Sequence, residues 1–155
     1  MQYNLKAPDR LQATVTLPAS KSISNRVSIL SALAPEAAPL INLADSDDGR
    51  ALQHALRSAD ETVDIGAAGT AMRFLTAYYA ARPGHTRLLT GSARMRQRPI
   101  GLLVDALRGL GADITYTERE GYPPLRIVGQ RLRGGEVTMD SGVSSQFLSA
   151  LLMVA

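Results

Sequence analysis

One arrangement occurs three times along these 155 residues: a strand-like run, then small polar residues, then an apolar helix-like run. The helical runs begin near Ser20, Gly69 and Ser144. Repeated strand–helix units cannot bury their apolar faces alone and therefore stack as helices against sheets. We expect an α/β (α+β) fold, and no flexible linker divides the chain into separate domains.

Composition narrows the class of protein. With 45% hydrophobic and 20% charged residues, the chain is typical of a soluble globular domain with a real core. It contains no cysteine, which excludes disulfides, thiolate metal sites and a cysteine nucleophile. No secretory leader opens the chain and no apolar run reaches about 18 residues, so we expect a cytoplasmic protein without a membrane partner.

Metal ligands are scarce in this sequence. His54 falls in a helical pattern and His85 in a Pro-Gly turn, so the two histidines predict no metal cluster. Three acids, Asp45, Asp47 and Asp48, could form a metal site, but they directly precede a helical pattern. We expect them to cap that helix, and we expect no metal and no organic cofactor.

Periodicity and the positions of proline and glycine predict the individual elements. The expected strands cover 11–17, 40–43, 62–65, 86–90, 112–117, 125–128 and 136–139, and the expected helices cover 22–33, 49–58, 71–81, 99–110 and 144–155. The last helix is apolar and has no polar residue or glycine after it. Such a helix needs a partner surface, so we expect a truncated portion of a larger protein, or a chain that buries this end against another copy.

The first helix start has the residues of an anion site. Unpaired backbone N–H groups and the positive end of the helix dipole favour a phosphate or carboxylate there. Ser22 and Arg26 are four residues apart and share a helical face, with Lys21 at its mouth. Taken alone, the same residues also fit an ordinary helix cap followed by a solvated arginine.

Two further segments strengthen the anion interpretation. Gly69 and Thr70 open the second helix with little side-chain bulk, which lets a ligand approach the backbone; the alternative is close helix packing with Arg73 solvated. No Walker A loop and no G-x-G-x-x-G pattern occurs, which counts against nucleotides. The third start has two hydroxyls and an amide, Ser144, Ser145 and Gln146, which alone would be a structural cap.

Three alternating arginines precede Pro99. In an extended loop Arg94, Arg96 and Arg98 would point the same way, and three converging like charges favour an anionic ligand. The alternatives are a solvated basic loop or a nucleic-acid contact. Only two of the 17 basic residues are lysines, and aromatic residues are few, so we expect no nucleic-acid partner.

Read together, these motifs resemble the enolpyruvyl transferase family, and within it the branch that acts on shikimate 3-phosphate. The resemblance depends on six segments that follow the family's order over nearly the whole chain: 17–26, 42–48, 68–73, 94–100, 122–125 and 143–148. It implies βαβαββ units, about two of them in this chain, and a second domain that this chain does not contain. Both domains of the family flank the active site.

The implied reaction moves an enolpyruvyl group from phosphoenolpyruvate to the 5-hydroxyl of shikimate 3-phosphate and releases phosphate. By resemblance, Lys21 is a catalytic residue that touches both substrates. Shikimate 3-phosphate would bind Lys21, Ser22, Arg26, Ser144, Ser145 and Gln146, and phosphoenolpyruvate would bind Lys21, Gly69, Arg98 and Gln146. The family's proton-transfer residues lie outside the pattern matched here, so we expect the chain to be inactive alone and to need the complementary C-terminal portion.

Two alternatives remain at this point. The sister enzyme UDP-N-acetylglucosamine enolpyruvyl transferase shares the fold but uses a cysteine in this half, and the chain has none. A non-catalytic anion-binding fragment would keep the binding residues without turnover. Ala67 stands where the family has asparagine, which removes a side-chain amide from the phosphoenolpyruvate region.

Overall fold

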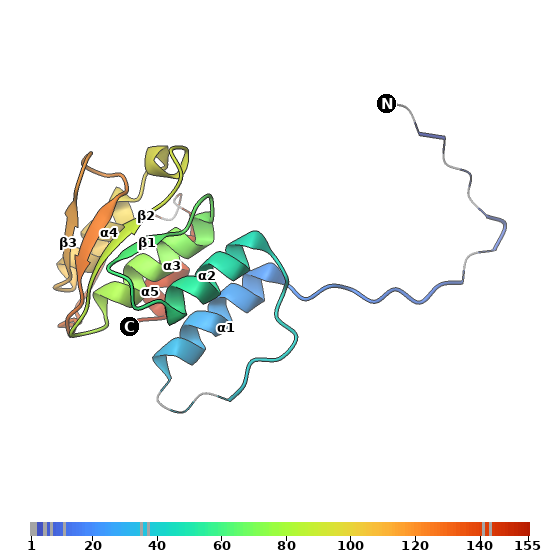
Figure 1. Ribbon diagram of the computed structural model, residues 1–155, viewed down its shortest axis with the longest axis horizontal. Coiled ribbons are helices and arrows are strands. Elements are labelled where there is room, and N and C mark those ends of the chain that lie inside the picture. Colours follow the sequence, from blue (N-terminus) through green and yellow to red (C-terminus); the bar gives the residue numbers. More distant parts are fainter. Residues whose placement is uncertain are drawn as a thin grey trace.

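The middle of the chain forms one complete βαβαββ unit. The computed structural model describes residues 3–4, 6, 8–10, 12–34, 36, 38–140, 142 and 144–155. The unit consists of β1 (Thr62–Asp64), α3 (Gly69–Ala80), β2 (Thr86–Thr90), α4 (Gly101–Gly109), β3 (Asp113–Tyr116) and β4 (Leu125–Val128). The expected α/β class, with helices packed on a mixed sheet, is confirmed (Figure 1).

The four strands form one mixed sheet in the order β1-β2-β4-β3. β1 and β2 are parallel, which requires the crossover that α3 supplies, whereas β4 is antiparallel to both β2 and β3. The register places Leu89 of β2 opposite Leu125 of β4, and Ile127 of β4 opposite Ile114 of β3. These apolar side chains are all buried, so one face of the sheet belongs to the core.

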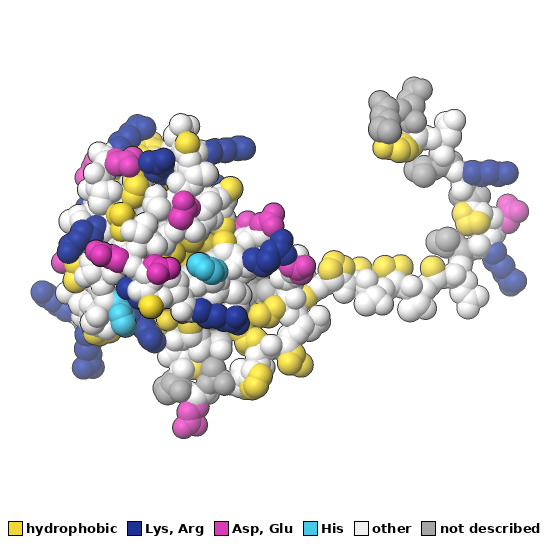
Figure 2. Space-filling model, in the orientation of Figure 1, with side chains coloured by type: hydrophobic (Ala, Val, Ile, Leu, Met, Phe, Trp, Pro, Cys, Tyr) yellow, Lys and Arg dark blue, Asp and Glu magenta, His cyan; other side chains and the backbone are white. Residues whose placement is uncertain are grey.

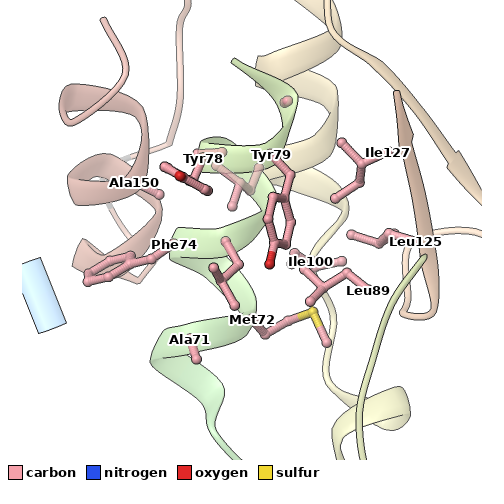
Figure 3. Close-up of a cluster of buried hydrophobic side chains, with 14 of the residues drawn as sticks. Ala71, Met72, Phe74, Tyr78, Tyr79, Leu89, Ile100, Leu125, Ile127 and Ala150 are labelled. Carbon is pink, nitrogen blue, oxygen red and sulfur yellow. The ribbon is translucent and has the colours of Figure 1, made fainter. Parts of the chain in front are cut away.

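The centre of the molecule is α3, in which every residue except Thr70 is buried. A helix that is apolar on all sides must be covered on all sides. Its Tyr79 lies toward the sheet side with Leu89 and Leu125, while Phe74 lies on the side of α5 (Ser145–Leu152) (Figure 3). The two remaining helices, α1 (Lys21–Leu33) and α2 (Asp47–Arg57), also pack on α3.

Helices α1, α2, α3 and α5 run in parallel. Contacts join start to start and end to end: Lys21 to Asp48 (α1 to α2), Gln146 to Thr70 (α5 to α3), and Tyr79 to the carbonyl of Ala55 (α3 to α2). Figure 1 shows the beginnings of α1, α2 and α3 at the same side of the body. The positive dipole ends of these helices are therefore gathered at one end of the domain.

Three predicted strands do not form in the described residues: 12–17 (residue 11 lies outside them), 40–43 and 136–139. Val15, Leu17 and Ile41 are 73%, 80% and 85% exposed, and Figure 2 shows apolar side chains along the extended segment before α1. Alternating residues favour an extended backbone, but a strand exists only when a neighbouring strand pairs with its N–H and C=O groups. No such neighbour lies beside these segments within the described part of the chain.

The helix predictions are confirmed, with small shifts at their starts, except that the last helix ends at Leu152 and does not reach residue 155. Ser46, rather than one of the three acids, caps α2 and accepts from the N–H of Gly49. Asp47 and Asp48 lie in the first turn, as predicted, whereas Asp45 precedes the cap and forms an ion pair with Arg50. α4 begins at Gly101 rather than at Pro99. In the described ranges no cluster of three acidic or histidine side chains could hold a metal.

The apolar last helix is half covered. Phe147 and Ala150 of α5 are buried against α3, whereas Leu148 and Leu152 are 42% and 77% exposed. The prediction that this helix needs a partner surface is thus met on one face by α3. None of the helices in the described part of the chain is long and apolar enough to span a bilayer.

Alkaline stability should depend on Tyr79. Burial raises the pKa of its phenol to about 12, and its hydroxyl donates to the carbonyl of Ala55 at 2.9 Å. The raised pKa favours the neutral phenol in the folded state, so this stabilisation is complete below pH 10 and is lost as the pH rises from 10 to 12. Two pKa units correspond to about 2–3 kcal/mol. We expect the free energy of unfolding, measured in urea between pH 9 and 12, to fall less steeply with pH for Tyr79→Phe than for the parent chain. Equal slopes for the two proteins would contradict this account.

Candidate functional site

The start of α1 combines a cation, a hydroxyl and a helix cap. Ser20 caps the helix by accepting from the N–H of Ile23. Lys21 is the first helical residue, and its Nζ lies 3.1 Å from a carboxylate oxygen of Asp48 at the start of α2. The side chain of Lys21 is half exposed while that of Asp48 is 22% exposed. The ion pair therefore directs the ammonium group across the common end of the two helices.

Arg26 is held on several sides at the same end of the molecule. Its Nη1 donates to Oγ of Ser22 at 2.5 Å and to the carbonyl of Ser22 at 3.0 Å, and its Nη2 donates to Oγ of Ser149 at 2.9 Å. Its guanidinium also lies over the ring of Phe74, 5.5 Å from the centroid. Ser22 and Arg26 share a helical face, as predicted, and Arg26 is fixed in place rather than freely solvated.

The start of α5 lies against the start of α3. Ser144 caps α5 and accepts from the N–H of Gln146 at 3.3 Å, while Ser145 is exposed in the first turn. Gln146 donates through Nε2 to Oγ1 of Thr70 at 3.3 Å. The structure therefore brings Ser144, Ser145 and Gln146 beside the second helix start.

The start of α3 has no side-chain cap, because Ala68 occupies the capping position. Gly69 packs directly beneath the guanidinium of Arg98, and a Cβ at this position would collide with it. Arg73, one turn further, donates to the carbonyl of Gly69 at 2.7 Å and stacks on Phe147 at 5.3 Å. Backbone N–H groups of the first turn thus lie beside a guanidinium, and both kinds of donor favour an anion.

Arg73 is buried, not solvated as one alternative supposed; it is 7% exposed. Burial lowers the pKa of this guanidinium, and the positive charge of Arg98 lowers it further. Among the residues that the structure describes, its Nε has no hydrogen-bond partner. A buried arginine next to a second one is costly unless negative charge is nearby, so both groups favour an anion at this end.

The basic loop differs from the prediction. Met95–Gln97 form a 3-10 helix, and Met95 is buried, so the loop is not extended and the three arginines do not point the same way. Arg96 forms an ion pair with Glu118 at 3.1 Å. Arg94 and Arg98 line one hollow of about 440 Å³ together with Ala67, Ser92 and Met95. Because the backbone turns through this 3-10 helix, Arg94 and Arg98, four residues apart, reach the same hollow.

These contacts form one continuous set. Arg26 links α1 to α5, Gln146 links α5 to α3, and Gly69 lies under Arg98. Within the described residues, Arg26, Arg94 and Arg98 have no acidic partner. Helix N-termini and unneutralised guanidinium groups at one end of a domain suit a ligand with more than one phosphate or carboxylate group.

The sequence profile of EPSP synthase (3-phosphoshikimate 1-carboxyvinyltransferase) matches residues 5–61 and 57–155, which is nearly all of the chain. The chain belongs to the EPSP synthase family. This match confirms the resemblance to the enolpyruvyl transferases, and it favours the branch that acts on shikimate 3-phosphate over the sister enzyme.

Relatives and solved structures agree with the EPSP synthase profile. The chain is 56% identical over 155 residues to a 3-phosphoshikimate 1-carboxyvinyltransferase of Bacteroides fragilis (strain YCH46), covering 99% of this chain and 37% of that protein. It is 44% identical to the protein of that name from Pseudoalteromonas translucida, covering 99% and 42%. An EPSP synthase structure from Acinetobacter baumannii has a TM-score of 0.80 at 25% identity, covering 90% and 37%. The chain thus spans about two fifths of the EPSP synthases it matches.

Sequence reasoning missed the residues that hold the site in shape. Asp48 was expected only as a capping acid, Ser149 was not singled out, and the stacking of Arg73 on Phe147 was not foreseen. All three act across elements far apart in the sequence. One feature of the sequence could have pointed to Ser149: serine is a weaker helix former than the apolar residues around it in the last helix, so a role other than helix stability is expected.

Proposed function

We propose that this chain supplies the shikimate 3-phosphate half-site, and part of the phosphoenolpyruvate site, of a 3-phosphoshikimate 1-carboxyvinyltransferase. One observation carries the proposal: contacts link the starts of α1, α5 and α3 in an unbroken series, and Arg26 lies at the junction. Membership of the EPSP synthase family supports the choice of substrates.

Shikimate 3-phosphate would bind where α1 and α5 begin. Arg26 and Lys21 offer the cations for its phosphate and carboxylate groups, and Ser22, Ser144, Ser145 and Gln146 offer hydroxyl and amide groups. A fixed guanidinium is suited to this task because its planar fork matches two oxygens of one anion. Lys21, positioned by Asp48, would lie between the two substrates and act as the catalytic cation.

Phosphoenolpyruvate would bind beside Gly69 and Arg98, at the start of α3. The uncapped N–H groups of α3 and the hollow lined by Arg94 and Arg98 offer donors for its phosphate and carboxylate. Gln146 lies between the two sites because it contacts Thr70. Ala67 opens into the hollow without the amide of the family's asparagine, so the cationic groups would carry more of the binding.

Two polyanions repel each other, and fixed cations with helix N-termini offset that repulsion when both are bound side by side. Transfer joins the 5-hydroxyl oxygen to the enolpyruvyl carbon and then expels phosphate, which needs proton donors and acceptors within hydrogen-bond reach. We propose that a complementary C-terminal portion, as in the longer EPSP synthases, supplies those groups and covers the exposed Leu148 and Leu152. Self-association through these leucines is the competing outcome.

Calorimetric titration of the 155-residue chain with shikimate 3-phosphate, followed by phosphoenolpyruvate, tests this function. We expect the first ligand to bind with a dissociation constant of millimolar or lower. Phosphate release should be absent for the chain alone and should appear when the C-terminal portion of an EPSP synthase is added. No binding by a folded sample would refute the half-site, and no recovered turnover would favour the non-catalytic anion-binding alternative.

Gly69→Ala separates the two substrate sites in the same titration. The added Cβ must displace the guanidinium of Arg98 and would lie 3.1 Å from Nη1 of Arg73, and since both are the ends of flexible side chains, the fold should persist. We expect weaker binding of phosphoenolpyruvate with unchanged binding of shikimate 3-phosphate. Gly109→Ala is the matched control, because a Cβ there meets no atom of the described residues within 4 Å.

A further inference from the structure

We propose that Ser149 is a positioning residue, which fixes the guanidinium of Arg26 in the orientation that receives the phosphate-bearing substrate. The inference rests on the proposed function and goes beyond it, because Ser149 lies outside the helix start and belongs to neither predicted substrate site. Its Oγ accepts from Nη2 of Arg26 at 2.9 Å.

The two terminal nitrogens of Arg26 have different tasks. Nη1 is occupied by Ser22 of the same helix, through both Oγ and the carbonyl oxygen. Those bonds are local, since a residue four positions earlier on a helix is always within reach. Among the described residues, the bond from Nη2 to Ser149 is the one hydrogen bond that joins the guanidinium to another element, so it fixes the rotation of the guanidinium group that the bonds to Ser22 leave open.

Phe74 and Ser149 restrain the guanidinium group of Arg26 in different ways. The guanidinium carbon lies over the ring, 5.5 Å from its centroid, and this contact restrains the distance of the guanidinium group from the ring more than its rotation. The hydroxyl of Ser149 sets that rotation. A free arginine side chain loses about 2 kcal/mol of rotamer entropy when it is fixed. Because Arg26 is already fixed before binding, the entropy lost when the ligand binds is smaller.

Ser149 also joins the two halves of the site. It lies one turn after Ser145 on α5, and Arg26 lies one turn after Ser22 on α1. Their bond therefore keeps the α1 start and the α5 start in register. Ser149 is partly buried and lies between the buried Phe147 and Ala150, so its own position is fixed by the packing of α5 on α3.

The test replaces Ser149 by valine and by threonine, which have nearly the same shape and differ in the hydroxyl. Binding of shikimate 3-phosphate is measured by calorimetry, and the Arg26 Nε–Hε signal is followed by NMR without ligand. We expect Ser149→Val to weaken binding about 3- to 10-fold, as loss of one hydrogen bond predicts, and to broaden the Arg26 signal. Ser149→Thr should retain both properties, and Ser31→Ala, in the last turn of α1, should change neither.

Each result decides the question. Parental affinity and an unchanged Arg26 signal in Ser149→Val would overturn the proposal, as would equal losses in the valine and threonine variants. If the parent chain binds no shikimate 3-phosphate, the proposed function fails, but the ligand-free Arg26 signal still reports whether Ser149 holds the guanidinium. A signal that does not respond to Ser149→Val then overturns the positioning role separately.

Discussion

Replacing Leu89 by alanine is expected to lower the free energy of unfolding by about 2–5 kcal/mol. Leu89 lies in the second strand of the sheet, is fully buried, and pairs in register with Leu125. Figure 3 shows it among Tyr79, Ile100 and Met72, where α3 meets the sheet. Truncation removes buried methyl groups and leaves a cavity that rigid neighbours on two elements cannot close. For a domain with about 5–15 kcal/mol of total stability, this is a large fraction.

Urea denaturation followed by circular dichroism measures this effect. Leu102→Ala is the matched control, because Leu102 is a leucine on α4 that is 51% exposed. It should shift the midpoint much less, since about half of this residue already contacts water. Equal losses for the two variants would show that the sheet and α3 do not form the central core.

Replacing Arg26 by alanine is expected to weaken binding of shikimate 3-phosphate by about 10- to 150-fold. A hydrogen bond to a charged group contributes about 1.5–3 kcal/mol, and each 1.4 kcal/mol is a factor of ten in affinity. Arg26 has no acidic partner among the described residues, so its charge is available to a ligand phosphate. Its loss also releases Ser22 and Ser149 from their bonds.

Two comparison variants separate charge from geometry. Arg26→Lys keeps the charge but not the planar fork, so it should recover only part of the affinity. Arg57→Ala removes an exposed arginine in the last turn of α2, at the opposite end of the parallel helices, and should leave binding unchanged. Equal losses for Arg57→Ala and Arg26→Ala would mean that net charge, rather than the site, attracts the ligand.

Local pattern was sufficient for much of the secondary structure. The strand at Thr86–Thr90 lies where it is predicted, after the helix stop at Pro83-Gly84, and Ser20, Ser46 and Ser144 cap helices as their hydroxyls predict. These features depend on residues within one turn or one strand of each other. The strands predicted at 12–17 and 40–43 do not form for the same reason. A strand also needs the edge of a neighbouring strand to pair with, and the local sequence pattern does not say where such an edge lies.

The candidate site shows the same division. The residue types of an anion site, Lys21, Ser22, Arg26, Gly69 and Arg98, were recognisable from helix starts and from the resemblance to the enolpyruvyl transferases. Their mutual placement was not. The ion pair of Lys21 with Asp48 and the bond of Gln146 to Thr70 join separate helices, and burial of Met95 turned the predicted row of arginines into a bent loop.

The sequence by itself determined the class of fold, the βαβαββ pattern of residues 62–128, the family, and the helix starts where anions are expected. Only the tertiary structure decided that α1, α2, α3 and α5 run in parallel, so that their starts meet at one end, and that Ser149 and Phe74 hold Arg26 there. The physical reason is range. Caps, periodicity and turns act within a few residues, whereas the direction of a guanidinium is set by whichever distant side chain the packed core brings within hydrogen-bond reach.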